Sequence, residues 1–288
     1  MPENTDYHRP SDLEAACQLL AEYDDTTVVA GNQSLGLMTK EGVISPERFV
    51  DINNIDELNG ITQVDDTLQV GALTTHRSVE TSTLVQKTTP VFGEAASRIA
   101  DVQIRNAGTV GGATAYADPT ADYPPVFLAL DASILTQSVD ETSKYSADEF
   151  FVGYYESALD ADELITTIEL PVMGVNEGAG FEKLAFREND RAIVNVAAYI
   201  EMDNEICTNA RIGIGGVPDH PHQAKSAAEK LIDTKVGDEV IAEAAEDAKS
   251  TTPIMPDPSL SEDYQEQMVE QFVTQAVKQA RNNAGEEL

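Results

Sequence analysis

The stretch VVAGNQSLGL, residues 28–37, joins two β-branched residues to a short run of small and polar ones. Val28 and Val29 favour a buried strand, because branched side chains pack well on a pleated sheet. Gly31 lets the backbone approach a neighbour closely, and the Asn, Gln and Ser that follow favour a turn. The stretch therefore predicts a buried strand that ends in a loop with very little side-chain cover.

The residues on either side of this loop predict a small α/β unit. Residues 11–14, SDLE, form a capping box, and the apolar residues after them have helical spacing, which predicts a helix up to about Tyr23. Cys17 lies on the apolar face of that helix and is expected in the core. A further strand is expected near residues 50–55, which read VDINNI.

A second α/β unit is predicted between these elements and about residue 175. Within it, residues 90–101 and 124–132 favour helices, whereas residues 133–138 and 163–170 favour strands.

The last part of the chain predicts a sheet followed by helices. Residues 180–217 alternate in a way that indicates three antiparallel strands. Helices are expected at about residues 223–232, 238–249 and 260–282, with the proline-rich residues 251–259 as a loop between the last two.

A second glycine-rich stretch, IRNAGTVGGATAYADPTADYPP, covers residues 104–125. Its glycines allow close approach of a ligand, and successive backbone N–H groups can hold an anion without any positive side chain. No Lys or Arg occurs between Asn106 and Ser143, so backbone donors would have to hold an anion bound here. Neither glycine-rich stretch matches G-x-G-x-x-G or the P-loop pattern, which disfavours a Rossmann dinucleotide site and an NTPase.

The composition is strongly acidic, with 51 acidic against 18 basic residues and a formal net charge of −33. Nucleic-acid phosphates would be repelled, so a DNA or RNA partner is not expected. Acidic residues recur along the whole chain rather than in one tail, which indicates a surface adapted to the high salt of a halophile. An ordinary acidic mesophilic protein is the alternative, although it would usually contain more lysine.

Several other classes find no support in the residues. No run approaches the roughly 18 consecutive apolar residues of a membrane span, and the opening MPENTDYHRP lacks the pattern of a secretory signal, so the expected compartment is the cytoplasm. Cys17 and Cys207 are too few for a disulfide framework, a cysteine zinc site or an iron–sulfur cluster, so any redox chemistry must come from a bound cofactor. His220 and His222 lie near prolines in an expected surface loop without a second ligand cluster, and no metal site is predicted.

Together the two glycine-rich stretches are far more specific than either alone. VVAGNQSL followed by QIRNAGTVGGATAYADPTAD resembles the paired signature of the flavoprotein subunit of molybdenum hydroxylases, the family of carbon monoxide dehydrogenase and xanthine dehydrogenase. The resemblance also includes DYHRPSDLEAACQLL, DELITTIELP and GFEKLAFRENDRAIVNVAA, and so covers nearly the whole chain. It implies an α+β protein with an FAD-binding PCMH-type fold. Two N-terminal α/β subdomains, about 1–58 and 59–175, would form the FAD-binding domain, and 176–288 a C-terminal domain with a three-stranded antiparallel sheet and a helical bundle.

The resemblance further implies that FAD lies between the two N-terminal subdomains, with its pyrophosphate held by both glycine-rich stretches. The family commonly reads T-I-G-G-N in the second stretch, whereas this chain has Ala113 in the last position, which removes one amide side chain. Tyr116 and Asp118 are candidates of second rank. Carried over by position, the cofactor-binding residues are Val28, Val29, Ala30, Gly31, Asn32, Gln33, Ser34, Leu35, Ile99, Thr109, Val110, Gly111, Gly112, Ala113, Asp122, Ile165 and Lys183.

Positive charge is concentrated near one of these residues, since Lys183, Arg187 and Arg191 fall within a single short stretch. We expect the two arginines to pair with the acidic residues beside them, Glu182, Glu188 and Asp190. For Lys183 the resemblance favours a place near the flavin, where an ammonium group could stabilise the negative charge of the reduced ring.

The function implied by the resemblance is electron transfer through FAD, from iron–sulfur centres to an acceptor such as NAD or a quinone, with no catalytic residue assigned in this chain. The iron–sulfur centres and the molybdenum cofactor would belong to a small and a large partner subunit, assembled as a dimer of heterotrimers. Two alternatives remain: a stand-alone flavoenzyme that acts on its own substrate, and a non-catalytic scaffold that has lost its flavin. The substrate of the complex and the electron acceptor are not readable from these residues.

Overall fold

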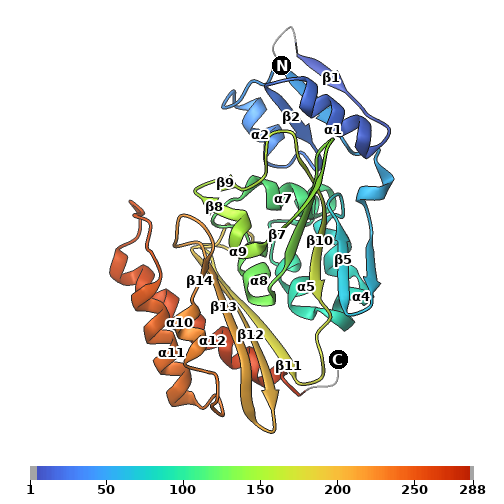
Figure 1. Ribbon diagram of the computed structural model, residues 1–288. Helices are drawn as coiled ribbons and strands as arrows, with labels where there is room; N and C mark the ends of the chain where they lie inside the picture. Colours follow the sequence, from blue (N-terminus) through green and yellow to red (C-terminus); the bar gives the residue numbers. More distant parts are fainter. Residues whose placement is uncertain (1–4, 286–288) are drawn as a thin grey trace.

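The computed structural model describes residues 5–285. The expected domains begin at residue 1 and end at residue 288, so residues 1–4 and 286–288 of them lie outside the described residues. Within that range the strands form a three-stranded, a five-stranded and a four-stranded sheet and one short two-stranded hairpin. Figure 1 shows the first sheet at one end of the molecule, the five-stranded sheet in the middle, and the four-stranded sheet with the last helices at the other end. No helix of residues 5–285 is long and apolar enough to cross a bilayer.

The first sheet is parallel, in the order β1-β3-β2. The capping box at residues 11–14 predicts Ser11 as the helix cap, but the cap is Asp12, whose side chain accepts a hydrogen bond from the N–H of Ala15. The first helix therefore begins one residue later than expected, at Leu13. The elements of this subdomain are β1 (Asp6–His8), α1 (Leu13–Glu22), β2 (Thr26–Val29), α2 (Leu35–Lys40), β3 (Arg48–Asp51) and η1 (Asp56–Leu58).

The second sheet is antiparallel, in the order β4-β5-β10-β6-β7. Its helices pack around a core in which the rings of Phe92, Tyr123 and Phe127 contact one another. The strands are β4 (Ile61–Val64), β5 (Thr67–Gly71), β6 (Ser133–Gln137), β7 (Thr142–Ser146) and β10 (Leu164–Pro171). The helices are α3 (His76–Thr81), α4 (Thr83–Thr88), α5 (Pro90–Ser97), α6 (Val102–Ala107), α7 (Val110–Tyr116), α8 (Tyr123–Leu130) and α9 (Ala147–Phe150), followed by the hairpin of β8 (Phe151–Gly153) and β9 (Glu156–Ser157).

The third sheet has the order β11-β12-β13-β14. The expected three antiparallel strands are present, but a two-residue strand adds a fourth, so the predicted number was wrong, and His222 lies in that strand rather than in a loop. The elements are β11 (Glu177–Leu184), β12 (Val194–Asp203), β13 (Ile206–Gly215), β14 (His222–Gln223), α10 (Lys225–Glu229), α11 (Asp238–Thr251) and α12 (Glu262–Asn283).

Strand β12 joins two hydrophobic cores. Ala197 and Tyr199 belong to the core shared with the five-stranded sheet and α8, whereas Val196 and Ala198 belong to the core formed with α10, α11 and α12. Side chains alternate between the two faces of a strand, so one strand can serve both cores. The C-terminal sheet is therefore held against α8, directly behind the second glycine-rich segment.

Candidate functional site

The two glycine-rich segments lie against each other, although they are far apart in the sequence. Gly31 faces Ala107 and Gly108, and a Cβ atom on Gly31 would lie only 2.8 Å from the Cα atom of Gly108. A Cβ atom on Gly112 would lie 3.9 Å from the Cβ of Ala30. The residues that follow β2 thus lie directly against α6, α7 and the chain between them, and glycine at position 31 is required for this contact.

The first segment leaves β2 with unused backbone donors. Asn32 has φ +57°, in the left-handed region that Asn tolerates better than most residues. The first turn of α2 has no side-chain cap, and no hydrogen bond within residues 5–285 uses the N–H groups of Asn32, Gln33 or Ser34. These three consecutive donors can therefore bind an anionic ligand, as the sequence predicts for this loop.

The second segment differs from the expected anion-holding loop, because it begins a helix. Thr109 caps α7, and its side chain accepts a hydrogen bond from the N–H of Gly112 (3.2 Å). The N–H groups of Val110 and Gly111 donate to the carbonyls of Thr74 (2.9 Å) and Ala72 (2.8 Å). The interpretation of this stretch as a nest of free donors was therefore wrong: the helix cap and the neighbouring chain already satisfy these groups.

The glycines of the second segment have different roles. A Cβ atom on Gly111 would lie 2.5 Å from the Cβ of Ala72, so packing against the chain after β5 requires this glycine. Gly112 is exposed and Ala113 is half-buried, whereas Thr109 and Val110 are buried. A ligand can therefore reach the surface of this segment at Gly112 and Ala113.

Asp122, at the start of α8, and Lys183, in β11, form a buried ion pair. Lys183 Nζ donates to Asp122 Oδ2 at 2.8 Å and to the carbonyl of Arg98 at 3.0 Å, and its side chain is 3% exposed. Burial raises the pKa of the Asp122 carboxyl, while the contacts with Lys183 and Asn195 oppose that rise. The ammonium group is thus bound to a carboxylate of this chain, which the sequence did not reveal.

Asn195 completes this buried cluster and was missed by the sequence reasoning. Its Nδ2 donates to the carbonyl of Ala121 at 2.9 Å and to Asp122 Oδ1 at 3.2 Å, and the residue is fully buried. The only signal in the sequence is a polar residue inside the apolar strand VNVAAYI.

Arg191 does not pair with its neighbours in the sequence. It forms an ion pair with Asp118 (3.2 Å) and donates to the hydroxyl of Tyr155 (3.0 Å). The ring of Tyr155 packs against Tyr116 with centroids 5.0 Å apart, and the hydroxyl of Tyr116 contacts Met38 Sδ at 3.9 Å. The second-rank candidates Asp118 and Tyr116 therefore belong to a cluster that connects α7 to α2, β8–β9 and the β11–β12 loop, and the local pairing proposed for Arg191 was wrong.

The two apolar candidates have different environments. Ile99 is half-buried at a corner where Ala100 has φ +41°, and Arg105 Nη1 holds that corner by donating to the carbonyls of Ile99 (2.8 Å) and Ala100 (2.7 Å). Ile165 is 5% exposed in β10 and belongs to the main core. Of the two, Ile99 is accessible to a ligand.

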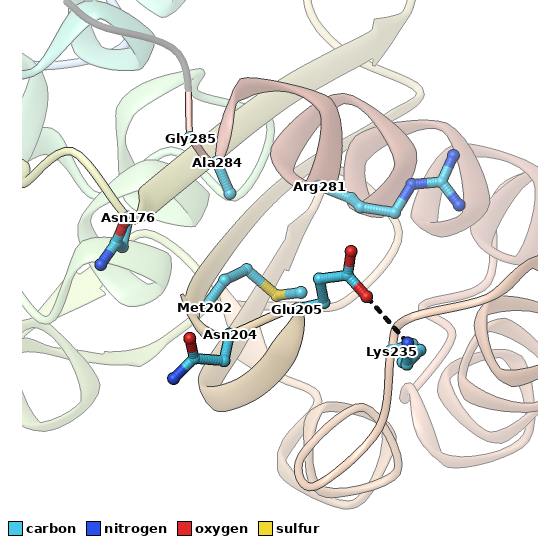
Figure 2. A pocket seen from close by; sticks show the side chains of 8 residues that line it. All are labelled: Asn176, Met202, Asn204, Glu205, Lys235, Arg281, Ala284 and Gly285. Atoms are coloured by element: carbon cyan, nitrogen blue, oxygen red, sulfur yellow. Dashed lines mark hydrogen bonds and ion pairs between the residues drawn. The ribbon is translucent and has the colours of Figure 1, made fainter.

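A cavity of about 380 Å³ lies in the C-terminal part of the molecule (Figure 2). None of the residues that line it belongs to either glycine-rich segment. Its charged side chains already have partners: Lys235 pairs with Glu205 at 2.8 Å, and Arg281 with Asp238 at 3.2 Å. Among residues 5–285 no group of three or more His, Cys, Asp or Glu could hold a metal ion. The candidate site therefore remains the surface formed by the two glycine-rich segments.

Comparison with protein families identifies both parts of the chain. Residues 3–173 match the FAD binding domain in molybdopterin dehydrogenase, and residues 179–280 match the CO dehydrogenase flavoprotein C-terminal domain. The chain belongs to the molybdopterin dehydrogenase flavoprotein family. Its cofactor is FAD.

Relatives of this flavoprotein cover nearly its whole length. The 6-hydroxypseudooxynicotine dehydrogenase complex subunit alpha of Paenarthrobacter nicotinovorans is 34% identical over 98% of this chain and 96% of its own. The glyceraldehyde dehydrogenase medium chain of Sulfolobus acidocaldarius is 31% identical over 96% of this chain and 99% of its own. A solved carbon monoxide dehydrogenase from Hydrogenophaga pseudoflava has a chain with TM-score 0.95 and 30% identity, covering 99% of both chains. The expected α+β fold is thereby confirmed.

The residues of the flavoprotein's site fit an anionic dinucleotide. Consecutive free N–H groups at Asn32, Gln33 and Ser34 suit phosphate oxygens, and the bare surface at Gly112 leaves room beside them. In a chain of net charge −33, these neutral backbone donors could attract an anion without a positive side chain.

Proposed function

We propose that this chain is the FAD-carrying electron-transfer subunit of a molybdenum-containing hydroxylase. Electrons from the iron–sulfur centres of a small partner subunit would pass through FAD to an external acceptor, while a large partner subunit carries the molybdenum cofactor, in a dimer of heterotrimers in the cytoplasm. The names of the relatives, which are medium chains and complex subunits, support this assembly. Residues 1–175 would form the FAD-binding domain and 176–288 the second domain.

The observation that carries this proposal is the contact between the two glycine-rich segments beside three free N–H groups. Asn32, Gln33 and Ser34 would donate to the pyrophosphate, and Ala30, Gly31, Leu35, Gly112 and Ala113 would line its path. Ile99 would meet an apolar part of the cofactor. The floor of the site would be formed by the buried or half-buried candidates Val28, Val29, Thr109, Val110, Gly111, Asp122, Ile165 and Lys183.

The side chains near this site hold and orient the backbone segments that would contact FAD. When bound, FAD supplies one-electron and two-electron redox chemistry. The buried Asp122–Lys183–Asn195 cluster holds α8 against the C-terminal sheet, and Arg105 fixes the corner that carries Ile99. Because Asp122 and Lys183 are paired and buried, neither is free to exchange protons with a substrate, which favours electron transfer over a stand-alone flavoenzyme.

The test is to mix substrates with the lone protein under anaerobic conditions while the flavin absorbance is followed. We expect dithionite to reduce the FAD-loaded chain, whereas carbon monoxide, purines and aldehydes leave it oxidised. Substrate should reduce the flavin only after an iron–sulfur subunit and a molybdenum subunit from the same organism are added. Bleaching by a substrate without any partner would contradict the electron-transfer assignment and favour the stand-alone enzyme.

A further inference from the structure

A buried carboxylate lies directly behind the first glycine-rich segment. Asp51 ends β3, pairs with Val29 at the end of β2, and is 2% exposed. It accepts hydrogen bonds from the Tyr7 hydroxyl (2.5 Å), from Arg9 Nε (2.8 Å) and from the backbone N–H of Asn53 (3.0 Å). A carboxylate with this many donors has a fixed orientation.

The side chain of Asn53 connects this carboxylate to the segment. Its Nδ2 group donates to Asp51 Oδ1 at 2.7 Å and to the carbonyl oxygen of Ala30 at 3.0 Å. An amide nitrogen carries two hydrogens in one plane, so the bond to Asp51 determines where the second hydrogen points. That second hydrogen meets the peptide that joins Ala30 to Gly31.

Holding this carbonyl determines the direction of the next donor in the chain. The carbonyl of Ala30 and the N–H of Gly31 belong to one planar peptide, so they point in opposite directions and cannot rotate separately. Asn32 then turns into the left-handed region, and the free N–H groups of residues 32–34 follow. The hydrogen bond from Asn53 thus fixes the peptide plane from which the backbone of residues 32–34 continues.

The charges around Asp51 suit a site for an anion. Burial raises the pKa of Asp51, but the hydrogen bonds from Tyr7, Asn53 and Arg9 outweigh it and lower the pKa to about 2. The carboxylate is thus ionised at neutral pH, and the guanidinium of Arg9 balances its charge. Asp51 can therefore orient Asn53 with little added repulsion toward a phosphate.

From this geometry we infer that Asp51 and Asn53 are positioning residues for FAD: Asp51 orients the amide of Asn53, which holds the Ala30 carbonyl and aims the backbone donors of the first segment. The inference rests on the proposed placement of FAD at the two segments. Neither residue touches the cofactor; both act through the backbone of residues 30–34.

The test is a set of FAD titrations of the full-length apoprotein, with the variants N53A, D51N and D51N/N53A. Loss of the bond to Ala30 should raise the dissociation constant of FAD about tenfold in N53A, the scale of one lost hydrogen bond. D51N should have a similar effect. Because Asp51 acts through Asn53, the double variant should bind FAD no more weakly than N53A, a non-additive result that general loss of stability would not produce.

Two control variants match these substitutions. Asn54 is an exposed neighbour whose side chain makes no hydrogen bond within residues 5–285, so N54A should bind FAD like the wild type. Glu163 is a buried carboxylate that accepts from Thr136 Oγ1 at 2.9 Å and the Tyr145 hydroxyl at 3.3 Å. E163Q, like D51N, should lower the melting temperature, but it should leave the FAD dissociation constant unchanged.

A further variant, G112V, separates failure of this inference from failure of the proposed site. Its side chain would project toward Thr109 Oγ1 and Ala30, between the two segments, and should abolish FAD binding. If G112V loses FAD while N53A keeps wild-type affinity, the positioning role is overturned and the site stands. If G112V and N53A both bind normally, the site itself is overturned, and the inference with it. Effects of D51N and N53A that multiply in the double variant would show that Asp51 does not act through Asn53.

Discussion

His76 shows how one buried side chain can make stability depend on pH. Its Nδ1 lies 3.0 Å from the Tyr123 hydroxyl, and its backbone N–H donates to the carbonyl of Gly108 at 3.0 Å. Burial, and next the charge of Arg105, lower the pKa of His76 from 6.5 to about 4. The unfolded chain therefore takes up a proton as pH falls below 6.5, whereas the folded protein does so only near pH 4. The free energy of unfolding should thus decrease between these two values.

We expect H76Q to weaken this dependence, since glutamine keeps a polar group near Tyr123 but does not titrate. Urea unfolding between pH 7 and pH 4 gives, for each protein, the slope of the free energy of unfolding against pH. The wild type and H76Q contain the same carboxylates, so the difference between their slopes reports His76 alone. H220Q is the matched control, because His220 is partly exposed and, within residues 5–285, its side chain hydrogen-bonds Asp219 alone. Equal slopes for the wild type and H76Q would show that His76 is not kept neutral by burial.

The Asp122–Lys183 pair joins secondary-structure elements from both domains. Asp122 directly precedes α8, Lys183 is in β11 and Asn195 is in β12. K183M would leave a buried carboxylate without its cation, so the free energy of unfolding should fall by about 3 to 5 kcal/mol. The double variant D122N/K183M should recover part of this loss, because the stranded charge is removed. Chemical denaturation of both variants tests this.

Lys144 provides the comparison for this pair. It lies 2.8 Å from Glu169 but is 61% exposed, so K144M should cost only about 0 to 1 kcal/mol. A loss for K183M as small as that for K144M would mean that the buried pair does not hold the elements together.

The whole molecule carries a net charge of −33, and this predicts that its stability depends on salt. The Debye length grows from about 3 Å at 1 M salt to about 10 Å at 0.1 M, so repulsion between acidic side chains increases as salt is removed. The melting temperature should therefore fall as KCl is lowered over this range. A parallel series at constant 0.1 M KCl with added sucrose separates screening from general exclusion effects. A melting temperature that is flat in KCl, or that responds equally to sucrose, would contradict the role of charge.

Much of the fold could be predicted because local patterns determine local structure. The apolar spacing of α1 and α12 and the alternation along β12 and β13 are visible in the residues themselves. The short strands β1 and β14 were not predicted, since three or two residues form a strand only when a neighbouring strand pairs with them. The start of α7 was taken for a loop because of its glycines, whereas the Thr109 cap and the contact with Ala72 make it a helix.

The sequence by itself determined the family, the cofactor and the two segments that form the candidate site, because these depend on residue types at fixed spacings. Only the tertiary structure decided which groups of that site are free. The N–H of Gly111 is bound to Ala72, Lys183 Nζ is bound to Asp122, and the Ala30 carbonyl is held by Asn53. Each of these bonds joins residues that are distant in the chain. A local sequence pattern cannot show which distant donors and acceptors come within 3 Å of one another when the core packs.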